Sequence, residues 1–225
     1  MNTRKMSINS DFLRMLIILA ALLVFAGITR GGAFMSVLNF QTIGKQLTEY
    51  GLMAMGLSMA MITGGIDLST VYIANLCGAT AALLMKSIAP QGQIGGILLA
   101  CAAALLVGLL CGSLNGFLVS IVRVPPMLAT LGTYELFYGI TIVLGKGKSI
   151  TTIAPFKKFA SCMVFGVVPL PFVIFVLAAV ILSVIVSRTP FGRRLHLVGV
   201  NAKASKFSGI NNVRVITTAY MISGL

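Results

Sequence analysis

The stretch IGGILLACAAALLVGLLCGSLNGFLVSIV, residues 94–122, contains 29 residues and no charged side chain. About 20 apolar residues are enough to cross a hydrocarbon core roughly 30 Å thick as an α-helix. A run of this length therefore spans the core even when the helix is tilted. This stretch predicts a membrane-spanning helix, and apolar runs on both sides of it repeat the pattern.

The composition of the whole chain points the same way. Of 225 residues, 58% are hydrophobic and only 9% are charged, whereas soluble domains carry roughly 25% charged residues. The 17 Lys and Arg outnumber the 4 Asp and Glu, giving a net charge of +13. These basic residues are scattered between apolar runs, which is typical of membrane topology rather than of a nucleic-acid surface. The composition excludes a water-soluble enzyme and predicts an integral protein of the lipid bilayer that binds no nucleic acid.

The apolar runs predict an all-α, polytopic transmembrane helix bundle with about six spans and the start of a seventh. The spans are expected at residues 12–29, 47–66, 68–85, 94–122, 127–144 and 169–187, and a further run begins at 215. Residues 30–46 are expected to form a loop or a short interfacial helix. The last run stops after 11 residues without a cap or a tail, so we expect an incomplete C-terminus. Residues 1–225 are interpreted as one transmembrane domain.

The basic residues also predict the orientation, because they concentrate on the cytoplasmic side of membrane proteins. With a cytoplasmic N-terminus and two separate spans at 47–66 and 68–85, ten basic residues lie inside and seven outside. Joining these two runs into one crossing places eight basic residues inside and nine outside. We favour separate spans, because they place the most basic loop, residues 188–214, in the cytoplasm.

Glycines repeat at every fourth position of the central run, at Gly108, Gly112 and Gly116. On a helix they align into a groove that allows close approach of another backbone. Packing within one chain is favoured over a dimer interface. The four cysteines have neither CxxC spacing nor neighbouring ligands, so no metal site or disulfide is expected.

A first interruption of the apolar runs is TGGIDLS, residues 63–69, which contains Gly64, Gly65, Asp67 and Ser69. Asp67 is suited to cap the helix that follows. A carboxylate at membrane depth is costly, and such groups are usually paired or face a water-filled cavity. We favour the capping role over direct contact with a substrate or ion.

A second interruption is Val124-Pro125-Pro126, which ends the central run because proline lacks an amide and disfavours helix before it. Thr130 and Thr133 give the next span a small, polar face, and Asn115 could hydrogen-bond across helices. Together with the first interruption, these residues are interpreted as a translocation path or as structural breaks.

The loop 188–214 predicts a short cytoplasmic helix over residues 202–208, with Asn201 as its N-cap and Gly209 as its stop. Ala204 and Phe207 fall on one face, beside a basic rim. Such a helix is suited to docking into the groove of a partner protein; the alternative is an amphipathic helix that lies on anionic headgroups.

No nucleotide site is expected. The segment GKGKS, residues 145–149, lacks the glycine that a phosphate-binding loop requires, since Ile142 stands at that position. The chain also contains no Ser/His/Asp arrangement and no pair of carboxylates suited to hydrolysis. If ATP is used, another polypeptide binds it.

Several motifs occur together and in a characteristic order. They are Gly64-Gly65-Ile66-Asp67-Leu68-Ser69, Asn115-Gly116, Val124-Pro125-Pro126, Ala129-Thr130-Leu131-Gly132-Thr133, and then Thr189, Phe191-Gly192-Arg193, Gly199, Asn201, Ala204 and Ser208-Gly209-Ile210-Asn211. Over residues 47–225 they resemble the permease subunits of bacterial ribose-type monosaccharide ABC importers. The chain departs from the family pattern at Thr70-Val71-Tyr72, because a small residue is usual where Tyr72 stands.

The resemblance implies a multi-pass permease of the bacterial inner membrane, without cofactors or enzymatic activity of its own. Its partners would be a second permease subunit, identical or different, a cytoplasmic ABC ATPase and a periplasmic sugar-binding protein. Residues 201–210, including Ile210, would form the coupling helix that receives the motion of the ATPase. Family permeases continue beyond this point with further spans.

Two other interpretations remain at this stage. A proton-linked secondary transporter or channel would use the carboxylates of Asp67 and Glu135. The chain as given could also be inactive on its own. The sequence does not identify the transported sugar.

Overall fold

The computed structural model describes residues 10–225 except 165 and 167. Its helices are α1 (Ser10–Phe34), α2 (Val37–Ile62), α3 (Thr70–Ile88), α4 (Ile94–Ser120), α5 (Pro126–Gly145), α6 (Ala154–Ala160), α7 (Leu170–Arg188), α8 (Pro190–Val200), α9 (Ala202–Phe207) and α10 (Asn212–Gly224). Two short strands, β1 (Met163–Val164) and β2 (Val168–Pro169), pair antiparallel before α7. The fold is an all-α, polytopic membrane bundle, as expected.

Within the described residues, five helices are long and apolar enough to cross a membrane: Phe12–Phe34 within α1, and α3, α4, α5 and α7. Helix α2 is also 26 residues long, but it carries Lys45 and Glu49 in its first half. The two runs at 47–66 and 68–85 belong to separate helices, α2 and α3, which the segment 63–69 joins. The two runs thus form two helices, as expected, while the number of crossings that they make stays a prediction.

Residues 30–46 were expected to form a loop or a short interfacial helix, and the structure shows helix along most of this segment. Helix α1 continues through a kink at Arg30, and α2 begins at Val37. The side chain of Ser36 caps α2 by accepting a hydrogen bond from the amide of Asn39, at 3.2 Å. The polar, Gly-rich start of the segment suggested a loop, but polarity does not break a helix where a cap starts it and no proline stops it.

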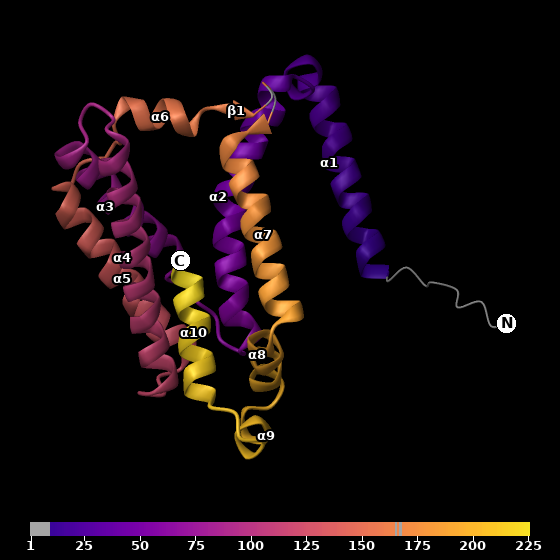
Figure 1. The fold of residues 1–225 in the computed structure, drawn as a ribbon. Coiled ribbons are helices and arrows are strands. Elements are labelled where there is room, and N and C mark those ends of the chain that lie inside the picture. Colours follow the sequence, from indigo (N-terminus) through magenta and orange to yellow (C-terminus); the bar gives the residue numbers. More distant parts are fainter. Residues whose placement is uncertain (1–9, 165, 167) are drawn as a thin grey trace.

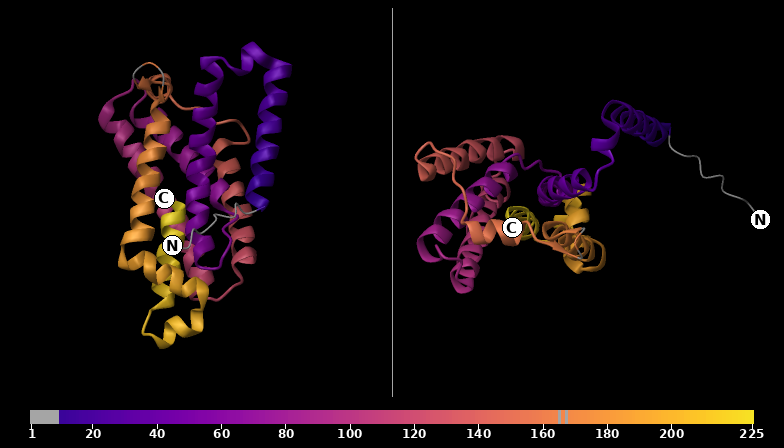
Figure 2. Two further views of the ribbon diagram at one scale, coloured as in Figure 1. Left: turned by 90° about the vertical axis from the view of Figure 1, so that its right-hand side faces the viewer. Right: turned by 90° about the horizontal axis from the view of Figure 1, so that it is seen from above.

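The helices form two groups with α10 between them (Figures 1 and 2). Helices α3, α4 and α5 make up one group, and α2 and α7 make up the other. Helix α1 lies outside both groups and is joined to α2 at the end of the bundle where α6 lies (Figure 1). Helix α6 and the strands lie at one end of the bundle, and α8 and α9 lie at the opposite end. The two ends are called here the α6 end and the α9 end.

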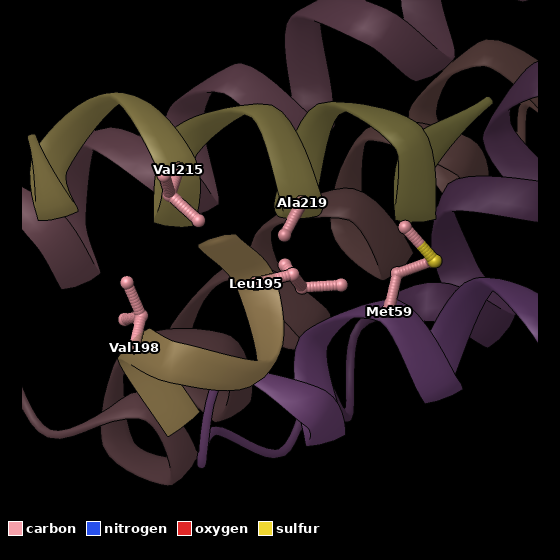
Figure 3. Packing of buried hydrophobic residues seen from close by; sticks show 5 residues of the cluster. All are labelled: Met59, Leu195, Val198, Val215 and Ala219. Atoms are coloured by element: carbon pink, nitrogen blue, oxygen red, sulfur yellow. The ribbon is translucent and has the colours of Figure 1, made fainter. Parts of the chain in front are cut away.

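A hydrophobic core at the α9 end joins α2, α8 and α10. It consists of Met59, Leu195, Val198, Val215 and Ala219 (Figure 3). Leu195 and Val198 lie one turn apart on α8 and are both buried. Because this face of α8 is buried against α2 and α10, α8 attaches the basic 188–214 segment firmly to the bundle.

The glycine stripe of α4 receives α10. A Cβ atom on Gly108 would overlap the carbonyl oxygen of Gly224, and one on Gly112 would overlap that of Tyr220. A Cβ atom on Gly116 would lie 2.8 Å from the Cα of Thr217. The stripe therefore packs within the chain and brings the backbones of α4 and α10 into close contact.

Candidate functional site

The break between α2 and α3 is fixed by glycine. Helix α2 ends at Ile62, and Gly64 follows with a φ of +87°, a conformation that side chains with a Cβ rarely adopt. Gly65 is buried, and a Cβ atom there would lie 2.5 Å from the hydroxyl oxygen of Tyr220. Non-helical backbone is tolerated within a membrane protein where it is covered by protein. Helix α10 provides part of that cover.

Asp67 is the centre of this break, and its side chain is 2% exposed. One carboxylate oxygen, Oδ1, accepts hydrogen bonds from the amide of Ser69 at 3.0 Å and from its hydroxyl at 2.7 Å. The other, Oδ2, accepts from the hydroxyl of Ser223 on α10 at 3.1 Å. Ser69, and not Asp67, stands at the N-cap position of α3. Asp67 instead stabilises the turn before the helix, three residues ahead of its start at Thr70, and ties this turn to α10.

Asn115 extends these contacts to α4 and α5. Its Nδ2 donates to the hydroxyl of Ser69 at 2.7 Å, and its Oδ1 accepts from the hydroxyl of Thr133 at 2.7 Å. We call Asp67, Ser69, Asn115, Thr133 and Ser223 the polar network. All five side chains are buried. The network connects the 63–69 break with α4, α5 and α10.

Thr130 makes a second connection to the break. Its hydroxyl lies 3.1 Å from the carbonyl oxygen of Ile66 and 2.9 Å from that of Pro126. Pro125 precedes α5 and Pro126 is its first residue, so the proline pair starts α5 beside the break. A cavity of about 270 Å³ lies here, lined in part by Gly64, Gly65 and Pro125.

The structure therefore gathers the residues of both predicted interruptions into one place, and it adds two that the sequence did not single out. Ser223 completes the network, and the hydroxyl of Tyr220 is the one buried side-chain N or O atom without a partner among the described residues. Both are in the apolar run at 215–225. Thr217, Tyr220 and Ser223 follow one another at intervals of three residues, which places their hydroxyl groups on one face of a helix. This spacing could have pointed to Tyr220 and Ser223 from the sequence.

Glu135 is not part of this site. It is exposed on α5 and lines a shallow, mainly apolar cavity with residues such as Leu136 and Gly139. Asp67, in contrast, is buried inside the bundle. A proton-transfer pair needs its two carboxylates in communication, so this separation does not favour the proton-linked alternative.

Helix α9 has the predicted start and end. The Oδ1 of Asn201 accepts hydrogen bonds from the amides of Lys203 and Ala204, both at 3.0 Å. After α9, Gly209 adopts a φ of +80°. Ala204 is exposed, and Phe207 is 93% exposed. Ile210, in contrast, packs against the hydrophobic core described above.

A family model described as branched-chain amino acid transport system / permease component matches residues 39–225. The chain belongs to this permease family. No solved structure gave a significant match to it.

Curated relatives of the permease are importers of small molecules. Ribose import permease protein RbsC of Bacillus subtilis (strain 168) is 34% identical over 197 residues, which cover 86% of this chain and 59% of the relative. Autoinducer 2 import system permease protein LsrC of Yersinia enterocolitica is 30% identical over 218 residues, which cover 96% of this chain and 58% of the relative. The permease thus spans about three fifths of the length of these relatives. The resemblance to ribose-type import permeases is confirmed.

Proposed function

We propose that this permease is a membrane subunit of an ATP-driven importer that translocates a monosaccharide delivered by a periplasmic binding protein. It would work in the bacterial inner membrane with a second permease subunit, identical or different, and with an ABC ATPase. The observation that carries the proposal is a direct connection, through α10, between the exposed helix α9 and the buried polar network.

The connection begins at the base of α10. The Nδ2 of Asn212 donates to the carbonyl oxygen of Ala202 at 2.7 Å, and its Oδ1 lies 2.9 Å from the hydroxyl of Ser205, which donates to it. Both of these partners belong to α9. Eleven residues further along α10, Ser223 donates to Asp67. A displacement of α9 by a bound ATPase would therefore be carried by α10 to the break that holds the polar network.

The charge at the α9 end supports the orientation. The basic residues there include Arg193, Arg194, Lys203, Lys206 and Arg214, and positive charge favours the cytoplasmic side. In this orientation α9 faces the compartment that contains ATP, and the N-terminus is also cytoplasmic. Residues 188–214 then serve as the coupling loop, with α8 as its anchor.

A monosaccharide is the proposed substrate because of the relatives' names. The curated relatives are named for ribose and autoinducer 2, whereas the family description names branched-chain amino acids. Ribose is a small polyhydroxylated molecule, and the curated relatives match the chain along 86–96% of its length. The relatives therefore favour a sugar-like substrate over an amino acid.

Coupling through α9 is tested with a pair of variants at Gly209. Proline cannot adopt a positive φ, so Gly209→Pro is expected to abolish ATP-dependent sugar uptake by the complete importer. Asparagine tolerates this conformation, so Gly209→Asn should retain most of the uptake. Ala204→Glu places a charge on the docking face and should also abolish coupling. Normal uptake by Gly209→Pro and Ala204→Glu, at equal membrane levels, would reject α9 as the coupling helix.

A further inference from the structure

A second cavity, of about 760 Å³, lies between α3, α5 and the segment 147–152 that leads towards α6. Its walls include Tyr72, Asn75, Tyr138, Thr141, Lys148 and Ser149, together with small residues of α3. Ligand sites in proteins commonly measure 300–1,000 Å³ and combine aromatic surface with a few polar groups. This cavity has both properties and belongs to neither the polar network nor the coupling loop.

The aromatic side of the cavity is held in place by ring contacts. Tyr72 of α3 packs edge-on against Tyr134 of α5, with ring centroids 4.4 Å apart. It also lies 4.9 Å from Tyr138, at an interplanar angle of 54°. Such contacts fix ring orientation across the two helices.

The polar side of the cavity offers neutral groups and one cation. Asn75, Thr141 and Ser149 supply an amide and two hydroxyl groups, which both donate and accept hydrogen bonds. Lys148 is the one charged residue that lines the cavity within the described part of the chain. An amino acid ligand carries both a carboxylate, which Lys148 could pair with, and an ammonium group, which no carboxylate in this lining would balance. A polyhydroxylated ligand needs only the groups that are present.

We propose that this cavity binds a neutral, polyhydroxylated small molecule of the monosaccharide class before it reaches the polar network. The assignment rests on the proposed function and adds the place and the contacts of the substrate. The cavity is lined by residues at the α6 end, which faces the periplasm in the proposed orientation. Tyr138 supplies an apolar ring face, and Asn75, Thr141 and Ser149 supply hydrogen bonds to hydroxyl groups.

Helix α3 connects the cavity to the polar network. Ser69, which hydrogen-bonds Asp67 and Asn115, immediately precedes α3. Tyr72 and Asn75 follow within two turns, roughly 9 Å along the helix axis at 1.5 Å per residue. A ligand held by Tyr72 and Asn75 therefore sits on the same rigid helix whose start the network fixes.

The first test measures sugar uptake by the complete importer in proteoliposomes, with labelled D-ribose, D-xylose and D-galactose. Asn75→Ala and Thr141→Val should each raise the KM for the transported sugar about fivefold, the effect of one lost hydrogen bond. Thr42→Val is the matched control, because Thr42 and Thr141 both donate to a carbonyl oxygen four residues earlier, at 2.8 Å. It should leave KM unchanged. Unchanged KM in both cavity variants would overturn the proposal while leaving the importer function intact.

The second test does not depend on transport. Ser149→Cys and Ser87→Cys are labelled in the complete importer with a membrane-impermeant maleimide, and the modified peptides are quantified by mass spectrometry. At least one of the three sugars should slow labelling at position 149 in a saturable way and leave the exposed position 87, outside the cavity, unaffected. Protection in an importer that fails to transport these sugars would support the site and reject the proposed transport. Protection by L-leucine but by none of the sugars, or no protection at all, would overturn the assignment.

Discussion

At the residue scale, Asp67 is a carboxylate buried among neutral donors. The amide and hydroxyl of Ser69 and the hydroxyl of Ser223 share its two oxygens. A buried donor that loses its acceptor costs roughly 1–3 kcal/mol, so the role of Asp67 is to satisfy these groups and hold the break in one conformation. Asn115 does the same for Ser69 and Thr133.

This role predicts different effects for two substitutions. Asp67→Asn keeps an oxygen for Ser69 and offers an amide to Ser223, so it should cost less than about 1 kcal/mol of stability. Asp67→Ala leaves all three donors unpaired, and at roughly 1–3 kcal/mol for each donor it should cost about 3 kcal/mol or more. Thermal unfolding in detergent measures the difference. A loss of uptake in Asp67→Asn without a loss of stability would instead indicate that the carboxylate carries a proton or an ion.

Phe207 is the exposed aromatic ring of α9, and such a ring is suited to anchor a protein interface. Phe207→Ala should weaken binding of the partner ATPase about tenfold or more, as expected for a central aromatic contact. Phe159→Ala is the matched control: Phe159 is 61% exposed but lies in α6, at the other end of the bundle. The affinity of the ATPase for each variant in lipid nanodiscs checks this. Equal affinity for both variants would reject the docking role.

Among the helices, α10 makes contacts with each of the parts that the proposed coupling requires. It packs on the glycine stripe of α4, contributes Val215 and Ala219 to the hydrophobic core, and supplies Ser223 to the polar network. Its base is fastened to α9 by Asn212. A rigid helix with contacts at both ends transmits displacement between them.

The packing of α10 predicts a contrast between two glycines. Gly112→Ala would overlap the carbonyl oxygen of Tyr220 and force α4 and α10 apart, which should cost about 1–3 kcal/mol. Gly139→Ala, on α5, meets no atom within 4 Å and should be neutral or stabilising by up to about 1 kcal/mol. Unfolding of both variants in detergent measures this. Equal stability of the two would contradict the packing of α10 on α4.

The hydrogen bonds between Asn212 and α9 predict that their loss uncouples sugar uptake from ATP hydrolysis. Asn212→Ala removes both hydrogen bonds to α9 but leaves the exposed face of α9 intact, so the ATPase should still bind while sugar uptake per ATP hydrolysed falls. Asn39→Ala is the control, since Asn39 makes a comparable bond to the carbonyl oxygen of Phe34 between α1 and α2. The ratio of uptake to hydrolysis in proteoliposomes is the measurement. An unchanged ratio in Asn212→Ala would exclude α10 as the connection.

Some elements could be predicted from the sequence for clear physical reasons. Helix α4 is encoded by a long uncharged run, and α9 by Asn201 at its start and Gly209 after its end. Both signals are local in the sequence, and both helices formed as expected. Helix α8 was missed although Thr189 caps it and Pro190 begins it, a local signal that was available. Ser223 and Tyr220 could not be placed from local pattern alone, because their role arises only when α10 meets the 63–69 break.

At the scale of the whole molecule, the two ends of the bundle differ in chemistry. The α9 end presents a short exposed helix with basic residues, and the α6 end borders a cavity lined by aromatic rings, neutral polar groups and Lys148. The polar network lies between them, at the break that starts α3. This arrangement suits a subunit that receives energy at one end and substrate at the other.

The most direct test of this account is the energy source of transport. The permease is reconstituted in proteoliposomes with its partner ATPase and binding protein, and uptake of labelled monosaccharides is compared under ATP and under an imposed proton gradient. We predict accumulation that requires ATP, the ATPase and the binding protein, and that a proton gradient alone does not support. Accumulation driven by a proton gradient in the absence of the ATPase would contradict the account.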